Sequence, residues 1–123
     1  ISNVETPFLK SFYIDKCISV LNLYEVDSVM GVIKEDANFY NHKGAGMVPL
    51  FKDNTLLSLE KDFIYRQVIG LRAFKKNKFL KSKTLSGEKV GHILIDEISS
   101  FNLNSDFSWK LAEFIDSKIM NSE

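Results

Sequence analysis

The stretch Val26–Tyr40, which reads VDSVMGVIKEDANFY, has the most regular hydrophobic pattern in the chain. Its apolar positions recur every three or four residues, and they are Val26, Val29, Met30, Ile33, Ala37 and Tyr40. Such spacing is typical of an amphipathic helix, and Asp27 is a residue that favours the N-cap of one. We therefore predict a helix over residues 27–40, followed by a loop at residues 41–46.

Toward the N-terminus, Thr6-Pro7 predicts the start of another helix, because threonine caps free N–H groups and proline loses no hydrogen bond at the first helical position. Residues 8–24 are apolar over most of the helix circumference. The polar exceptions form one narrow stripe, made of Ser11, Asp15, Ser19 and Asn22. This pattern predicts a central helix, covered on most sides.

Toward the C-terminus we predict a short helix near residues 55–61, a strand over about 63–74, and two strands, 79–85 and 89–95. The last two flank Ser86-Gly87-Glu88, which reads as the turn of a hairpin. Asn104 or Ser105 should cap a final helix. The predicted buried line of that helix is Phe107, Leu111, Phe114, Ile115 and Ile119.

The expected fold is therefore α+β, with two N-terminal helices, a central antiparallel sheet with a hairpin around Ser86-Gly87, and a C-terminal amphipathic helix. The 123 residues, 45% of them hydrophobic and 26% charged, predict one globular domain over residues 1–123.

Cysteine and hydropathy restrict the class of protein. Cys17 is the single cysteine, so an internal disulfide and a cysteine-ligated zinc site are both excluded. The sequence has neither the run of about 20 apolar residues that a membrane helix needs nor a signal-peptide pattern. We expect a cytoplasmic protein that does not bind a membrane. Abundant Asn, Lys, Ile, Phe and Ser against only four Ala indicate an AT-rich genome, and we expect a bacterial source.

Candidate catalytic groups are few. His42 and His92 could act as general base and general acid with Lys43 as a phosphate ligand, which is what a small metal-independent ribonuclease needs. Gly44-Ala45-Gly46 lacks the Gly-Lys-Ser/Thr ending of a phosphate-binding loop. No pattern of metal or cofactor ligands is present, so we expect neither, and enzymatic activity is the less favoured hypothesis.

The charge distribution gives a second alternative, nucleic-acid binding. The net charge is zero, yet residues 61–83 hold eight basic residues against one acid. The candidate phosphate contacts are Arg72, Lys75, Lys76, Lys78, Lys81 and Lys83. A domain built for nucleic acid is usually basic throughout, and the segments on both sides of this one are acidic.

The favoured hypothesis is a protein-binding module. On the predicted C-terminal helix, Trp109 and Met120 lie away from the expected buried line, beside Glu113 and Asp116. Tryptophan and methionine on a polar helix face are enriched at interfaces. We expect an inhibitor or immunity-type protein that neutralises a partner enzyme, such as a toxin or a nuclease.

Overall fold

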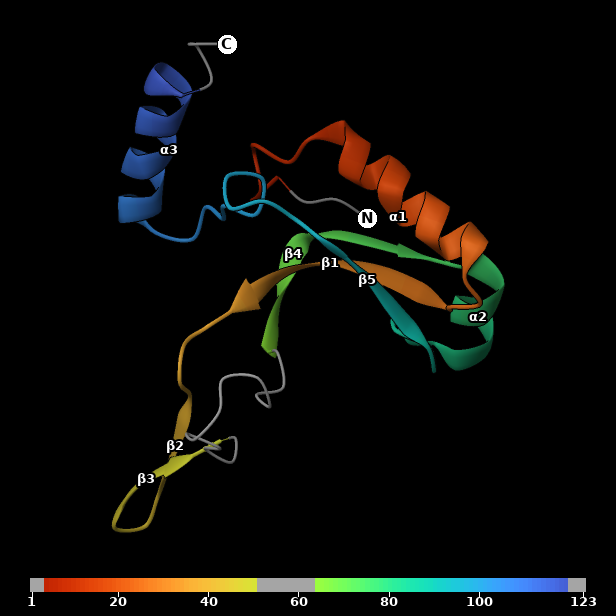
Figure 1. The fold of residues 1–123 in the computed structure, drawn as a ribbon, viewed down its shortest axis with the longest axis horizontal. Coiled ribbons are helices and arrows are strands. Elements are labelled where there is room, and N and C mark those ends of the chain that lie inside the picture. The colour runs from red at the N-terminus through yellow and green to blue at the C-terminus, as the bar shows by residue number, and fades with distance from the viewer. Residues whose placement is uncertain (1–3, 51–63, 120–123) are drawn as a thin grey trace. The chain divides into compact units, whose positions relative to one another are not determined.

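The computed structural model describes residues 4–50 and 64–119. Along these residues the element order is α1 (Ser11–Leu23), β1 (Ser28–Glu35), β2 (Tyr40–Lys43), β3 (Gly46–Pro49), β4 (Ile64–Phe74), α2 (Lys76–Ser82), β5 (Val90–Leu94) and α3 (Asp106–Lys118) (Figure 1). The α+β class is therefore confirmed. Within the described residues, no helix is long and apolar enough to cross a membrane.

The chain folds into two compact units. The first comprises Ile1–Ile33 and Gln67–Glu123, and the second comprises Lys34–Arg66. The expectation that the whole chain is one domain stays a prediction. The predicted helix near residues 55–61 lies outside the described residues.

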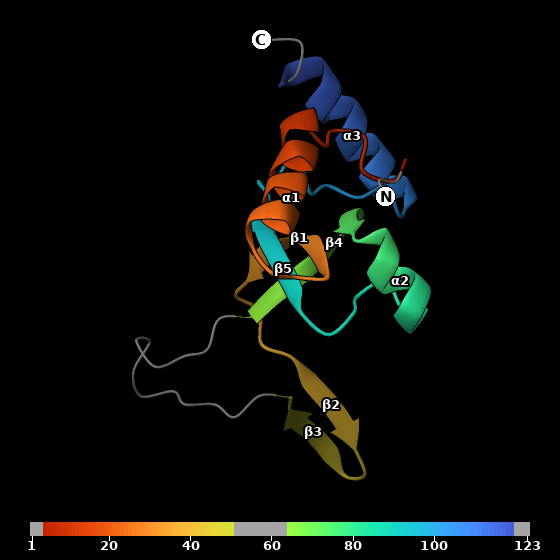
Figure 2. The same ribbon diagram turned by 90° about the vertical axis from the view of Figure 1, so that its right-hand side faces the viewer.

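The first unit is built on a three-stranded sheet with the order β4-β1-β5. β1 and β5 are parallel, with Ser28 opposite Val90 and Val32 opposite Leu94. β4 runs in the opposite direction to β1, so the sheet is mixed (Figures 1 and 2). The predicted strand over about 63–74 is confirmed as β4, whereas the predicted all-antiparallel sheet is wrong at β5.

The predicted second helix, over residues 27–40, is also wrong, because this segment forms β1 and the start of β2. Val29 and Val32 are both buried. Side chains alternate between the two faces of a strand, so these two residues, three positions apart, lie on opposite faces. A strand buried on both faces loses the polar alternation that marks a half-buried strand, so its sequence can imitate helical spacing. At Gly31 a Cβ atom would overlap the side chain of Ile95, a close approach that fits a packed strand.

The segment around Ser86-Gly87 does not close a hairpin; it connects the short helix α2 to strand β5. Residues 76–82 form the short helix α2, and the segment after it leads into β5, which pairs with β1 instead of with residues 79–85. Gly87 adopts a positive φ of 70°, as a turn glycine should. The predicted hairpin is therefore wrong, and only the need for a glycine at position 87 was recognised correctly.

Helix α1 covers the sheet beside β5, and it is less central than predicted. Only Tyr13 and Cys17 are buried along it, while Phe12, Ile14 and Ile18 are exposed. It starts at Ser11, later than predicted, because Thr6 is buried against Gly70 of β4 instead of capping the helix. The core under α1 consists of Tyr13, Cys17, Val29, Val68, Leu71, Ile93 and Ile95.

The second unit contains the antiparallel pair β2 and β3. His42 lies opposite Met47 and Lys43 opposite Gly46, so Gly44-Ala45 closes a two-residue hairpin with Gly44 at a φ of 57°. The loop predicted at residues 41–46 is thus a hairpin. The Asn-His-Lys-Gly-Ala-Gly composition marked the turn, but its flanking residues form strands.

Candidate functional site

Helix α3 begins at a well-defined cap. The Ser105 hydroxyl accepts a hydrogen bond from the backbone N–H of Ser108 at 3.1 Å, and the Ser108 hydroxyl accepts from the N–H of Ser105 at 2.9 Å. This reciprocal capping box identifies Ser105 as the N-cap, one of the two residues, Asn104 and Ser105, that were predicted for it. The chain just before the helix is held by Leu103, whose N–H donates to the Glu5 carbonyl at 2.8 Å.

The buried line of α3 differs from the predicted one. The buried residues are Ser108, Ala112 and Ile115, whereas the exposed fractions of Phe107 and Phe114 are 73% and 57%. The buried Ser108 hydroxyl also donates to the Ser105 carbonyl at 2.7 Å and accepts from the N–H of Asn104, so its polar atoms are satisfied within the cap. The helix is therefore rotated so that its inward side carries two small side chains, Ser108 and Ala112, together with Ile115.

This rotation leaves Trp109 exposed. Its side chain is 58% exposed on a flank that it shares with Glu113 and Asp116, which follow it by four and seven positions. Phe107 and Trp109 lie about 160° apart around the axis, so Phe107 and Phe114 belong to the opposite flank. We call Trp109, Glu113 and Asp116 the acidic tryptophan flank. Met120, predicted to join it, lies outside the described residues.

The basic segment is divided among three elements. Arg72 lies near the end of β4, Lys75 is the N-cap of α2, and Lys83 is its C-cap with a φ of 58°. Lys76, Lys78 and Lys81 lie on α2 itself, with exposed side chains. Lys78 forms an ion pair with Asp27 at 3.4 Å, and the guanidinium of Arg72 donates to the Ser86 hydroxyl at 3.4 Å. Two of the six candidate phosphate contacts thus have partners inside the chain.

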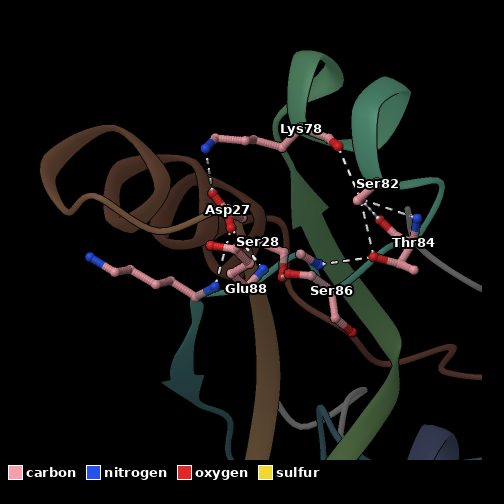
Figure 3. Close-up of polar contacts among 9 residues, drawn as sticks. Asp27, Ser28, Lys78, Ser82, Thr84, Ser86 and Glu88 are labelled. Carbon is pink, nitrogen blue, oxygen red and sulfur yellow. Dashed lines mark hydrogen bonds and ion pairs between the residues drawn. The ribbon is translucent and has the colours of Figure 1, made fainter.

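A cavity of about 260 Å³ lies beside these lysines and is lined by Asp27, Lys78, Lys81, Ser82, Gly87 and Glu88. Figure 3 shows the polar contacts that Asp27 makes with Lys78 and with the segment at Glu88. The Asp27 carboxylate accepts from the backbone N–H groups of Glu88 at 2.8 Å and Lys89 at 3.1 Å, in addition to its ion pair. The two backbone hydrogen bonds, and secondarily Lys78, hold the pKa of Asp27 below its ordinary value. Asp27 therefore holds the segment that leads into β5 in place. Its carboxylate stabilises the fold at this wall of the cavity.

Gly87 is the sensitive point of that turn. A Cβ atom there would lie 2.5 Å from the Cβ of Asp27, in addition to the cost of a positive φ, so we expect Gly87→Ala to lower the free energy of unfolding by about 1–3 kcal/mol. Gly44→Ala is the control, because Gly44 also has a positive φ but faces open space. Urea unfolding of both variants measures the difference. An equal loss in both would mean that the contact with Asp27 is unimportant.

The two histidines lie in different units. His42 is on β2 in the second unit, and His92 is on β5 in the first. The structure does not place one unit relative to the other, so the catalytic pair with Lys43 stays a prediction. Among the residues that the structure describes, no group of three or more His, Cys, Asp or Glu could hold a metal ion.

Buried polar groups near α1 form a structural cluster. The Tyr13 hydroxyl donates to the Asp96 carboxylate at 2.5 Å, and Ser99 donates to it from its N–H and its hydroxyl, both at 2.8 Å. Burial raises the pKa of Tyr13, and its hydrogen bond to Asp96 acts in the same direction. Burial also opposes ionisation of Asp96, but the hydrogen bonds from Tyr13 and Ser99 outweigh it and lower its pKa. Burial likewise raises the pKa of the Cys17 thiol, which is fully buried and packs as a small hydrophobe.

This cluster predicts a loss of stability in acid. A carboxyl whose pKa is lowered by folding contributes stability above its ordinary pKa, and the contribution disappears as the pH falls through the folded value, which is below about 4. Tyr13→Phe should therefore cost stability at neutral pH and progressively less below about pH 4. Urea unfolding over a pH series, with the exposed Tyr24→Phe as control, measures this. A difference between Tyr13→Phe and the unmodified chain that stays constant with pH would contradict it.

Comparison with known proteins adds no family to this picture. The sequence matches no protein-family model, and no curated protein is detectably similar to it. The site therefore has to be interpreted from its own chemistry.

The sequence missed the exposure of Phe107 and Phe114. The serines at 105 and 108 indicate where the helix begins, but a capping box does not indicate which side of the helix faces inward, so the sequence holds no signal for this exposure.

Proposed function

We propose that the chain is a protein-binding domain and that the acidic tryptophan flank of α3 recognises a basic protein. The observation that carries the proposal is the exposure of Trp109, which is 58%, on a helix flank that also presents Glu113 and Asp116. A large aromatic side chain is usually buried for the most part inside the fold. One that stays exposed to water next to carboxylates is therefore a candidate anchor for a partner.

The chemistry of the flank favours a basic partner over a neutral one. Burying an indole supplies apolar area with few rotatable bonds, and tryptophan is among the residues most enriched at binding hot spots. Glu113 and Asp116 attract basic side chains to the same place and speed the encounter. The two basic residues of α3, Lys110 and Lys118, follow Trp109 by one and nine positions, which places them about 100° and 180° around the axis from it.

The class of partner that we propose is an enzyme with a positively charged site, such as a nuclease or a toxin. Enzymes that act on nucleic acid carry lysine and arginine where phosphates bind, and an acidic surface with a central aromatic group can occupy such a site. The chain would then be an inhibitor or immunity-type protein. We propose that it works in the cytoplasm, where a buried thiol such as Cys17 stays reduced.

Nucleic-acid binding is the second candidate. Its support is the exposure of Lys76 and Lys81 on α2, next to Lys83 at its C-cap. These lysines could contact phosphates through charge alone, which gives binding without base preference and with a strong salt dependence. Binding of labelled RNA that persists at raised salt and falls when Lys76 and Lys81 are replaced by alanine would favour this candidate over the first.

Photo-crosslinking from α3 tests the first candidate. A photo-reactive amino acid is placed at position 109, and in a control chain at position 107, which is more exposed and lies on the opposite flank. Expressed in the source organism, the first chain should crosslink to one basic protein and the control should not. Crosslinking from neither position, equal crosslinking from both, or an acidic partner would overturn the proposal.

A further inference from the structure

Asp106 extends the acidic tryptophan flank toward the start of α3. It precedes Trp109 by three positions, whereas Glu113 and Asp116 follow Trp109 by four and seven. At about 100° per residue, the four side chains occupy an arc of about 80° around the helix axis, over a length of about 15 Å. All four are exposed. The tryptophan therefore has carboxylates on both sides of it along the helix.

Two of these carboxylates are direct neighbours of the indole. Residues three and four positions apart on a helix have Cβ atoms about 5–6 Å from one another, and helical side chains lean toward the N-terminus. Trp109 therefore leans toward Asp106, and Glu113 leans toward Trp109. Asp116 is a full turn further along and adds charge at a greater distance from the ring.

These carboxylates keep their negative charge available. Within residues 4–50 and 64–119, Asp106, Glu113 and Asp116 form no ion pair with a basic side chain. The basic residue of the helix that is nearest in sequence, Lys110, lies about 100° around the axis from Trp109. A cation that binds over the indole therefore displaces no partner of these groups in the described part of the chain.

We propose, on the basis of the proposed function, that the basic group bound by this surface is an arginine side chain of the partner. A guanidinium is planar and weakly hydrated, so it can stack on the face of the indole. Its five N–H donors point outward in the plane of the group. The carboxylates of Asp106 and Glu113, one on each side of the ring, can accept them as charge-assisted hydrogen bonds.

A lysine fits the same surface less well. Its ammonium is a compact, strongly hydrated charge with three donors, and it cannot lie flat on a ring while it donates to carboxylates on both sides. A purely acidic surface would attract arginine and lysine to a similar extent, because both carry one positive charge. The preference for arginine is therefore the property that the indole and its two neighbouring carboxylates add together.

Titration of the full chain with short peptides tests this preference. The peptides are Gly-Ser-X-Ser-Gly with blocked ends, where X is arginine, lysine or citrulline, the neutral planar counterpart of arginine. The indole N–H resonance of Trp109 reports binding, because the chain has no other tryptophan. The arginine peptide should shift this resonance saturably, with a dissociation constant at least about threefold below that of the lysine peptide. The citrulline peptide should leave the resonance unchanged.

Glu113→Gln is the second arm of the test. It should weaken the arginine peptide more than the lysine peptide, because the guanidinium loses an acceptor for two of its donors. Asp15→Asn is the matched control, since it removes the same charge from an exposed position on α1 and should preserve the preference. An equal loss of affinity for both peptides in Glu113→Gln would overturn the proposal.

The peptide results and the crosslinking results fail separately. Equal binding of the arginine and lysine peptides to the unmodified chain would overturn the assignment of arginine and leave the basic partner in place. Binding of the citrulline peptide, or of none of the three, would also overturn that assignment. Crosslinking from position 109 tests the proposed function itself, because it does not depend on which basic residue the partner presents.

Discussion

Trp109→Ala is expected to weaken binding of the protein crosslinked from α3 by about 2 kcal/mol or more, which is about thirtyfold in the dissociation constant. The physical reason is that the indole would be the largest apolar group buried at the interface, and Glu113 and Asp116 cannot replace its area. The stability of the chain should change by only about 0.5 kcal/mol, because the side chain is already more than half exposed. Calorimetric titration and urea unfolding measure the two quantities.

Phe107→Ala is the matched control for this variant. It removes a comparable aromatic side chain from the same helix, but on the flank opposite Trp109. Its affinity for the partner should stay close to that of the unmodified chain. If Phe107→Ala weakens binding as much as Trp109→Ala, the binding surface is not the acidic tryptophan flank.

Leu71→Ala is expected to lower the free energy of unfolding by about 2–5 kcal/mol. The Leu71 side chain is only 2% exposed and belongs to the cluster that joins β4 and β1 to α1, so its removal leaves a cavity that the sheet cannot close. Ile69→Ala is the control, two positions earlier on the same strand and 61% exposed. Urea unfolding should show a much smaller loss for the control, and equal losses would mean that the core lies elsewhere.

Local signals in the sequence predicted the elements that are stabilised locally. The cap at Ser105, the positive φ of Gly87 and the extent of β4 all follow from short-range chemistry, namely a side chain that bonds the first turn, a residue without Cβ, and apolar residues in alternation. Helix α1 was found for the same reason, although burial of Thr6 against Gly70 delays its start.

Long-range pairing explains the errors. Val26–Tyr40 imitates a helix because Val29 and Val32 are buried on opposite faces, and that burial depends on β5, about sixty residues further along the chain. The parallel pairing of β1 with β5 likewise cannot be recognised from the turn at Gly87, since that turn is compatible with a hairpin. Periodicity alone does not report which partner a strand will meet.

The candidate site was predicted in part. The sequence placed Trp109, Glu113 and Asp116 on one flank of a helix, and the helix exists with these positions exposed. It misjudged the opposite flank, because Phe107 and Phe114 are apolar yet exposed, while the smaller Ser108 and Ala112 are buried. For the basic segment, composition could not reveal that Lys78 and Arg72 are engaged by Asp27 and Ser86.

The fluorescence of Trp109 shows whether this side chain is exposed in the free chain and buried by a partner, because it is the only tryptophan in the sequence. In the free chain, Trp109 should show red-shifted emission that acrylamide quenches readily. In a complex with a partner that lacks tryptophan, or whose tryptophans are replaced, its emission should shift to the blue and be protected from acrylamide. A Trp109 that is already shielded in the free chain, or that acrylamide quenches equally in the complex, would contradict the claim that this side chain anchors a protein partner.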